Sequence, residues 1–224
     1  ALRRALDRTA QHGLTSVHDA GVSRADVERY QRFIADDHFP VRMYAMIGGR
    51  GDTFDYFCRE GTIATGDRLR VQSVKLYVDG ALGSRGAALL DDYSDDAGNR
   101  GLLMKQPDVL RQDVMDAVRC GFQVNIHAIG DRGNRVTLDA YEAAFDSLGT
   151  GIGRHRVEHA QILHPNDLPR FADMDVIASM QPTHATSDMP WAEDRLGADR
   201  IQGAYAFNSL EESGARLAYG SDFP

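Results

Sequence analysis

Cysteine, long apolar runs and basic clusters are all scarce in this sequence of 224 residues. Its two cysteines, Cys58 and Cys120, lie far apart and in no spacing typical of a metal site or a redox motif. We therefore predict two buried or half-buried thiols in a reducing, cytoplasmic environment. No stretch approaches the roughly 20 apolar residues that a membrane-spanning helix requires, so we expect no membrane partner.

Positive charge is also in the minority. Lys and Arg number 25 against 33 Asp and Glu, which gives a formal net charge of −8. Nucleic acids and anionic membranes bind basic patches, so this acidic chain argues against both. Hydrophobic residues at 42% and charged residues at 26% are ordinary for a globular protein and exclude disorder as the main state. We expect a small-molecule substrate, and a homo-oligomer remains open.

Short β-rich runs alternate with amphipathic stretches of helical period along the chain. The predicted strands are Leu14–Asp19, Val41–Ile47, Val71–Val78, Phe122–His127, His155–His159, Val176–Gln181 and Arg216–Ser221. The predicted helices are Leu2–His12, Arg24–Asp36, Asp52–Gly66, Asp108–Cys120, Gly133–Leu148, Pro165–Met174 and Ile201–Ser213. Strict alternation and nearly continuous apolar strands predict an α/β fold built on a parallel sheet.

Two architectures fit this alternation, a doubly wound sheet and a (β/α)₈ barrel. Residues with chemically capable side chains lie at the carboxyl ends of five predicted strands. A doubly wound sheet concentrates its site at one or two loops, whereas a barrel gathers its strand ends around one mouth. We therefore predict an incomplete TIM-type (β/α)₈ barrel. Its eighth strand is expected upstream of Ala1, because the sequence begins inside a predicted helix.

The longest irregular stretch is Asp79–Pro107, which is rich in Gly, Asp and Ser. A connection of this length without secondary structure often has a functional role. It follows a strand end, so we expect it to fold over the barrel mouth.

His127 and His159 close two consecutive predicted strands, and Asp222 follows the last one. The histidines could simply satisfy each other at the strand ends, and Asp222 could cap a following helix. Two imidazoles on neighbouring strand ends are nevertheless a natural way to bind a metal ion. A carboxylate at the same mouth would add a third ligand.

Lys75 lies in the middle of the strand VQSVKLYV, where burial of an unpaired ammonium group is costly. Three explanations stay open on the residues alone. Lys75 could form a Schiff base, pair with Asp79, or react with CO₂ to give a carbamate that bridges two metal ions.

Five blocks of the sequence resemble the amidohydrolase superfamily, in its amidohydrolase 3 or YtcJ-like branch. They are GLTSVHDAG, VKLYVDGALGSRGAALL, NIHAIGDRGN with RVEHAQIL, MQPTHATSD and LAYGSDFP. The resemblance implies a divalent metal, with zinc the simplest choice, as one or two ions. It implies carbamylated Lys75, His127, His159 and Asp222 as metal ligands, with Asp222 also the general base.

The family's His-x-His on strand one is missing from this sequence, as is its small C-terminal β-domain. We therefore expect residues 1–224 to be a single catalytic barrel domain truncated at both ends, and this fragment alone to be nearly inactive.

The resemblance further implies hydrolysis of a C–N bond in an amide or N-acyl amine, by metal-activated hydroxide. Four more residues face the same mouth and are candidates for substrate binding: Asp79, Arg85, Gln181 and His184. For Asp79 and Arg85, a salt bridge within the irregular stretch is an equal alternative to substrate binding. For His184, the equal alternative is a solvent-exposed histidine in a loop. Competing functions are an inactive barrel used in binding or assembly, and a Schiff-base aldolase that uses Lys75.

Overall fold

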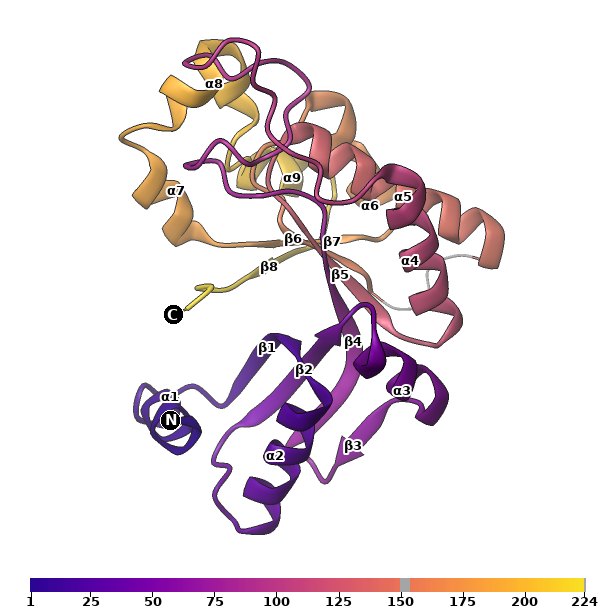
Figure 1. The fold of residues 1–224 in the computed structure, drawn as a ribbon. Helices are drawn as coiled ribbons and strands as arrows, with labels where there is room; N and C mark the ends of the chain where they lie inside the picture. Colours follow the sequence, from indigo (N-terminus) through magenta and orange to yellow (C-terminus); the bar gives the residue numbers. More distant parts are fainter. Residues whose placement is uncertain (150–153, 224) are drawn as a thin grey trace. The chain divides into compact units, whose positions relative to one another are not determined.

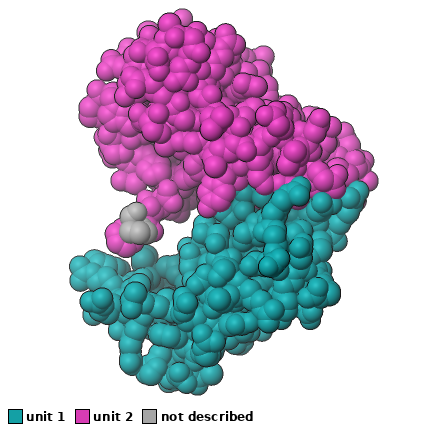
Figure 2. Space-filling model, in the orientation of Figure 1, with its two compact units in different colours: residues 1–76, 116–124 teal, residues 77–115, 125–224 magenta. Residues whose placement is uncertain are grey.

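The computed structural model describes residues 1–149 and 154–223. Pro224, the last residue of the LAYGSDFP block, lies outside the described residues. The chain divides into two compact units, which Figure 2 colours separately. Unit 1 comprises residues 1–76 and 116–124, and unit 2 comprises residues 77–115 and 125–224.

Unit 1 contains three parallel strands: β1 (Ser16–Val22), β2 (Arg42–Gly48) and β4 (Leu69–Tyr77), whose last residue already belongs to unit 2. A short strand, β3 (Ile63–Thr65), pairs with β4 in the antiparallel direction. The helices are α1 (Leu2–Gln11), α2 (Arg24–Ala35) and α3 (Asp52–Glu60). Four consecutive residues of β4, from Ser73 to Leu76, are buried, as expected for a strand covered on both faces.

Unit 2 continues the β/α alternation. Helix α4 (Pro107–Arg119) and strand β5 (Gln123–Ala128) cross the boundary between the units. Strands β6 (Arg156–His159), β7 (Ile177–Met180) and β8 (Leu217–Tyr219) then follow in parallel, in chain order. The other helical segments are α5 (Asp131–Leu148), η1 (Pro165–Asp167), α6 (Leu168–Asp173), α7 (Pro182–Asp188), α8 (Ala192–Arg200), η2 (Ile201–Gly203) and α9 (Phe207–Glu212).

The sheet has the strand order β1-β2-β4-β5-β6-β7-β8, with β3 beside β4 (Figure 1). Strands that follow one another in both sequence and sheet, with helices between them, are the repeat of a (β/α) barrel. The predicted α/β class and the incomplete TIM-type barrel are confirmed, and all seven predicted strands are present.

Three predicted segments differ in detail. The helix predicted over Asp52–Gly66 ends at Glu60, because Gly61 adopts a positive φ of 88° that stops a helix, and β3 follows. The loop after β7 contains α7 and α8, which the prediction missed although Pro182 is a typical first helical residue. The helix predicted over Ile201–Ser213 is divided into η2 and α9.

The prediction of two free thiols is wrong. Cys58 on α3 and Cys120 after α4 form a disulfide, with their Cα atoms 5.1 Å apart. Contact between the rings of Phe54 and Phe122 brings the two segments together within unit 1. A sequence separation of 62 residues gave no sign of this proximity. The thiol argument for a cytoplasmic location is thereby lost, and that location stays a prediction. In the described part of the chain, no helix is long and apolar enough to cross a membrane.

The long stretch that begins at Asp79 has almost no regular structure before α4, yet it is well packed. Leu82, Leu89 and Tyr93 are buried in one apolar cluster. The cluster also includes Ile129 after β5, Ile162 after β6, and Ala192 and Leu196 of α8. The stretch therefore packs against the segments that follow β5 and β6 and against α8.

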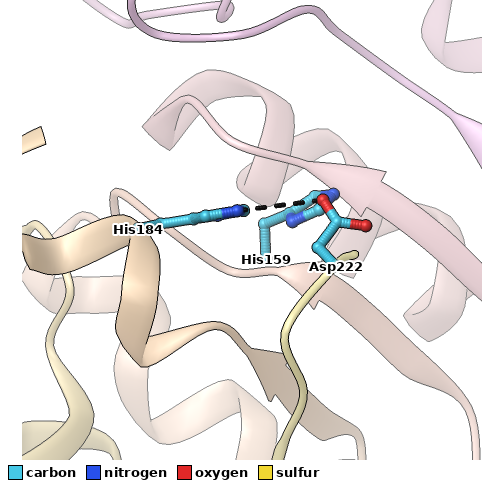
Figure 3. A group of neighbouring side chains, drawn as sticks. All are labelled: His159, His184 and Asp222. Carbon is cyan, nitrogen blue, oxygen red and sulfur yellow. Dashed lines mark ion pairs between the residues drawn. The ribbon is translucent and has the colours of Figure 1, made fainter. Parts of the chain in front are cut away.

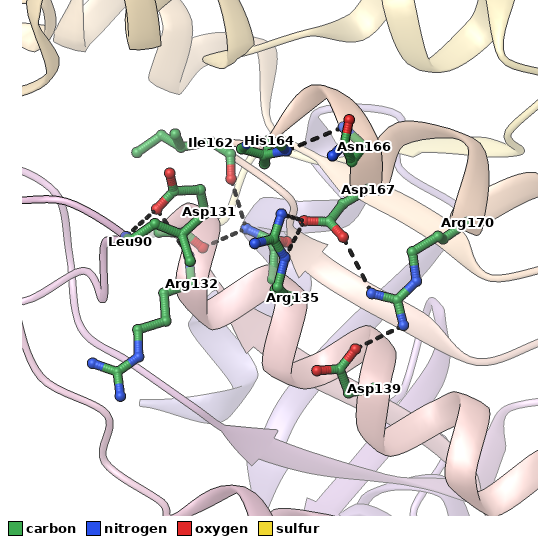
Figure 4. Close-up of polar contacts among 12 residues, drawn as sticks. Leu90, Asp131, Arg132, Arg135, Asp139, Ile162, His164, Asn166, Asp167 and Arg170 are labelled. Carbon is green, nitrogen blue, oxygen red and sulfur yellow. Dashed lines mark hydrogen bonds and ion pairs between the residues drawn. The ribbon is translucent and has the colours of Figure 1, made fainter.

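Ion pairs hold the helices of unit 2 in place (Figure 4). Buried Asp167 accepts hydrogen bonds from Arg135 and Arg170, and Arg170 also pairs with Asp139 of α5. Asp131 accepts a hydrogen bond from the backbone N–H of Leu90 and so joins the long stretch to the start of α5. These contacts connect α5 to η1, α6 and the long stretch.

Candidate metal centre

The carboxyl ends of four neighbouring strands in unit 2 carry ionisable side chains. His127 lies on β5, His159 ends β6, His184 lies on α7 after β7, and Asp222 follows β8. The ring centroids of His127 and His159 are 4.6 Å apart, and those of His159 and His184 are 5.8 Å apart. His184 Nε2 lies 3.8 Å from Asp222 Oδ2. The (β/α) repeat therefore brings these residues from distant parts of the sequence to one place.

Three of these side chains form a group that could hold a metal ion (Figure 3). His159, His184 and Asp222 each offer a ligand atom, and these atoms lie within 4.8 Å of one another. Three protein ligands plus water are the usual set of a catalytic zinc site. His184, predicted as a substrate residue, therefore lies where a ligand is expected, and His127 stands beside the group rather than in it.

The tautomer of His159 is fixed by its neighbour Gln181. His159 Nδ1 lies 2.7 Å from Gln181 Oε1, which can only accept a hydrogen bond. Gln181 Nε2 donates to the carbonyl of Ser179, at 3.2 Å, and thereby keeps Oε1 turned toward the imidazole. Nδ1 therefore carries the proton, and Nε2 keeps its lone pair. A metal-ligating histidine commonly has this second hydrogen bond, so His159 fits a metal.

Asp79 is enclosed in the protein. Its carboxylate accepts hydrogen bonds from the backbone N–H groups of Ala88, Ile129 and Gly130, at 2.8–3.0 Å. Burial raises the pKa of Asp79 to about 7, although these three N–H groups act to lower it. A Cβ atom at Gly133 would lie 2.5 Å from Oδ2, so the enclosure needs glycine there. This environment favours a structural role over the predicted contact with substrate.

Asp79 also lies beside one of the predicted ligands. Its Oδ1 is 3.6 Å from His127 Nε2. The buried carboxylate therefore connects the long stretch, the turn after β5 and the imidazole of His127.

Arg85 lies in an ion pair within the long stretch. Its guanidinium donates two hydrogen bonds to Asp95, from Nε at 3.1 Å and from Nη2 at 2.8 Å. Asp95 also pairs with Arg195 of α8, and the hydrogen bond from Arg85 lowers the pKa of Asp95. The salt-bridge alternative thus describes this arginine, and substrate binding by Arg85 stays a prediction.

Lys75 is buried in β4 with 7% of its surface exposed. Its neighbours Val74 and Leu76 are more deeply buried still, and its register partner on β2 is Gly48. Lys75 belongs to unit 1, whereas the histidines and Asp222 belong to unit 2. A buried amine in this strand is the chemical feature on which the carbamate prediction depends.

The sequence model of the Amidohydrolase family matches residues 1–224, the whole chain. The chain belongs to the amidohydrolase family. This agrees with the resemblance found in the sequence, and it explains why ionisable residues recur at the strand ends of this amidohydrolase chain.

Individual proteins extend the comparison. The chain is 31% identical to YtcJ of Bacillus subtilis over 231 residues, which cover 100% of the chain and 42% of YtcJ. It is 27% identical to the N-substituted formamide deformylase of Arthrobacter pascens, with 95% of the chain and 40% of that enzyme covered. An uncharacterized metal-dependent hydrolase from Pyrococcus horikoshii is 29% identical, with a TM-score of 0.88 over 99% of the chain and 44% of that protein. The amidohydrolase chain thus spans less than half the length of these relatives.

Three residues near the candidate centre were not predicted from the sequence: Gln161, Asp188 and Tyr205. They connect the segments that carry His159 and His184 through hydrogen bonds. Gln161 and Asp188 lie inside the blocks RVEHAQIL and MQPTHATSD, so their position in a block was the available signal. Their shared contacts join segments far apart in the sequence, which is why they were overlooked.

Proposed function

We propose that the protein is a metal-dependent hydrolase that cleaves a C–N bond in an amide or N-acyl amine. The observation that carries the proposal is the group of His159, His184 and Asp222 in an amidohydrolase chain. The similarity to a formamide deformylase supports a C–N substrate. The metal-dependent hydrolase from Pyrococcus horikoshii supports a divalent ion, and two imidazoles with a carboxylate suit zinc.

In this proposal His159, His184 and Asp222 hold the ion, with His127 and carbamylated Lys75 as further ligands. When bound, the ion makes water acidic enough to supply hydroxide near neutral pH and polarises the substrate carbonyl. Gln181 keeps Nε2 of His159 available by holding the proton on Nδ1. Burial of His159 and Gln181, each 7% exposed, limits the competition from solvent for these contacts.

We also propose Asp222 as the general base. Its side chain is 56% exposed, so its carboxylate can reach both solvent and substrate. We assign to it the proton of the attacking water, which it then passes to the leaving nitrogen. An amine leaves far more readily once protonated, and such a transfer contributes typically 10²–10⁴-fold to a rate.

The test is made on the full-length protein that contains this chain. Elemental analysis should find close to stoichiometric zinc, and a panel of N-acyl amines should show release of a free amine. His159→Ala should lose both properties. His38→Ala serves as the matched control, because His38 is an exposed histidine of unit 1.

Each competing function predicts a different result. A binding or assembly barrel would hold no zinc and release no amine. A Schiff-base enzyme would act without metal, and borohydride would trap a carbonyl substrate on Lys75. Either result would reject the metal-dependent hydrolase.

A further inference from the structure

Helix α7, which carries His184, is weakly fixed by packing. It has seven residues, and none of them is buried. An isolated helix of this length is not stable in water. The hydroxyls of Thr186 and Ser187 bond within the same helix, Thr186 to the carbonyl of Thr183 and Ser187 to the carbonyl of His184 and to Asp188 Oδ1. Contacts from outside α7 must therefore decide where His184 lies.

The last residue of α7, Asp188, makes such contacts. Its Oδ2 accepts a hydrogen bond from the phenol of Tyr205 at 2.6 Å and another from Gln161 Nε2 at 3.1 Å. Gln161 Nε2 also donates to the Tyr205 oxygen at 3.0 Å, which closes a triangle of polar contacts. Gln161 follows His159 by two residues, so the triangle connects the segment of one candidate ligand to the helix of another.

Tyr205 is held in the triangle from two sides. Its backbone N–H donates to the carbonyl of Gln161 at 2.7 Å, and its φ of 51° is unusual for a residue other than glycine. Burial, followed by the hydrogen bond to Asp188, raises the pKa of the phenol, which therefore stays protonated and donates. A strained backbone held by several contacts is typical of functional surroundings.

The triangle also borders the candidate centre. Gln161 and Tyr205 line the same shallow hollow as His159 and His184. Gln161 Nε2 and the Tyr205 hydroxyl are engaged with each other and with Asp188, which fixes this part of the wall.

We propose that Asp188, Tyr205 and Gln161 are positioning residues that hold His184 at ligand distance from His159. The inference rests on the proposed metal centre. Loss of the supporting partner of a metal ligand typically lowers metal affinity 10–100-fold, and we expect about tenfold for removal of the Tyr205 hydroxyl.

The experiment measures the zinc dissociation constant of the full-length protein by competition with a chelator. Tyr205→Phe removes one oxygen and should weaken zinc binding about tenfold. Tyr141→Phe is the control, because it removes the hydroxyl of another unit 2 tyrosine, a fully buried one, which donates to the carbonyl of Arg156 at 2.8 Å. Both variants should lower the thermal midpoint by about 2–4 °C, but only Tyr205→Phe should weaken zinc.

The possible results separate the two proposals. Unchanged zinc affinity in Tyr205→Phe, or equal weakening in both variants, would overturn the positioning role while the metal centre stands. Absence of zinc from the unsubstituted protein would overturn both. Gln161→Met, which keeps the side-chain length and removes both N–H donors, gives the same test if Tyr205→Phe does not fold.

Discussion

The two units use the same β/α repeat but place the carboxylates on or after their strands in different surroundings. In unit 1, half-buried Asp19 lies in the middle of β1 and accepts a hydrogen bond from the phenol of Tyr30 on α2. In unit 2, Asp222 after β8 has a side chain that is 56% exposed and faces His184 at 3.8 Å. The carboxylate of Asp19 is engaged by a neighbouring helix, whereas that of Asp222 is left accessible to solvent.

The disulfide and the candidate metal group also lie in different units. The disulfide Cys58–Cys120 lies within unit 1, together with the antiparallel strand β3. The group of His159, His184 and Asp222 lies within unit 2. The disulfide and the buried amine of Lys75 thus belong to unit 1, and the candidate metal group belongs to unit 2.

The largest effect is expected from His159→Ala. It removes the buried ligand whose tautomer Gln181 fixes, so zinc should be lost and kcat/KM should fall by about 10³-fold or more. As the comparison from unit 1, Asp19→Asn removes the charge of a carboxylate and should leave the zinc content unchanged. Elemental analysis and turnover of the two variants measure the contrast. Zinc loss in Asp19→Asn would mean that both units bind the ion.

Lys75→Ala tests whether unit 1 contributes to the chemistry. If the lysine bridges metal ions as a carbamate, the substitution should abolish turnover. A small carboxylic acid supplied with added metal should then restore part of it, because a carboxylate can replace the carbamate. Near-normal turnover in Lys75→Ala would instead make this buried lysine a structural residue and leave the chemistry to unit 2 alone.

The sequence could predict the repeat better than the detailed surroundings of the site. Apolar strands such as VQSVKLYV and the glycines between helices and strands predicted all seven parallel strands, because these signals are local. His127, His159 and Asp222 were found because each follows an apolar run. The disulfide, the enclosure of Asp79 and the pairing of Arg85 with Asp95 depend on contacts between distant segments, which leave no local pattern. His184 was assigned to substrate for the same reason, since only the fold places it beside His159.

Removal of the disulfide should affect stability but not metal content. Cys58→Ser frees a loop of 62 residues in the unfolded chain, which typically costs about 2–4 kcal/mol of unfolding free energy. Cys120→Ser and the double variant should cost the same amount, because all three remove one bond. Denaturant unfolding measures the cost, and zinc content should remain at the level of the unsubstituted protein. Additive losses for the two single variants would contradict a shared bond.

The smallest effect is expected at the start of α2 in unit 1. Ser23 Oγ accepts a hydrogen bond from the N–H of Asp26, and Asp26 Oδ2 accepts one from the N–H of Ser23, which forms a capping box. Ser23→Ala should cost about 1 kcal/mol of unfolding free energy, with no effect on zinc bound by unit 2.

The pH dependence of this cost has a definite sign. The hydrogen bond from the Ser23 side chain, followed by that from its backbone, lowers the pKa of Asp26 below its usual value of 3.8. The ionised carboxylate therefore stabilises the folded state above pH 3.8, and this contribution is lost as the pH falls through the lowered pKa. The difference in stability between the unsubstituted protein and Ser23→Ala should be complete at pH 7 and shrink below about pH 4. Urea unfolding at pH 7 and pH 3 measures this difference in unfolding free energy. A difference that grows at pH 3 would show that the hydrogen bonds from Ser23 do not stabilise the ionised form of Asp26.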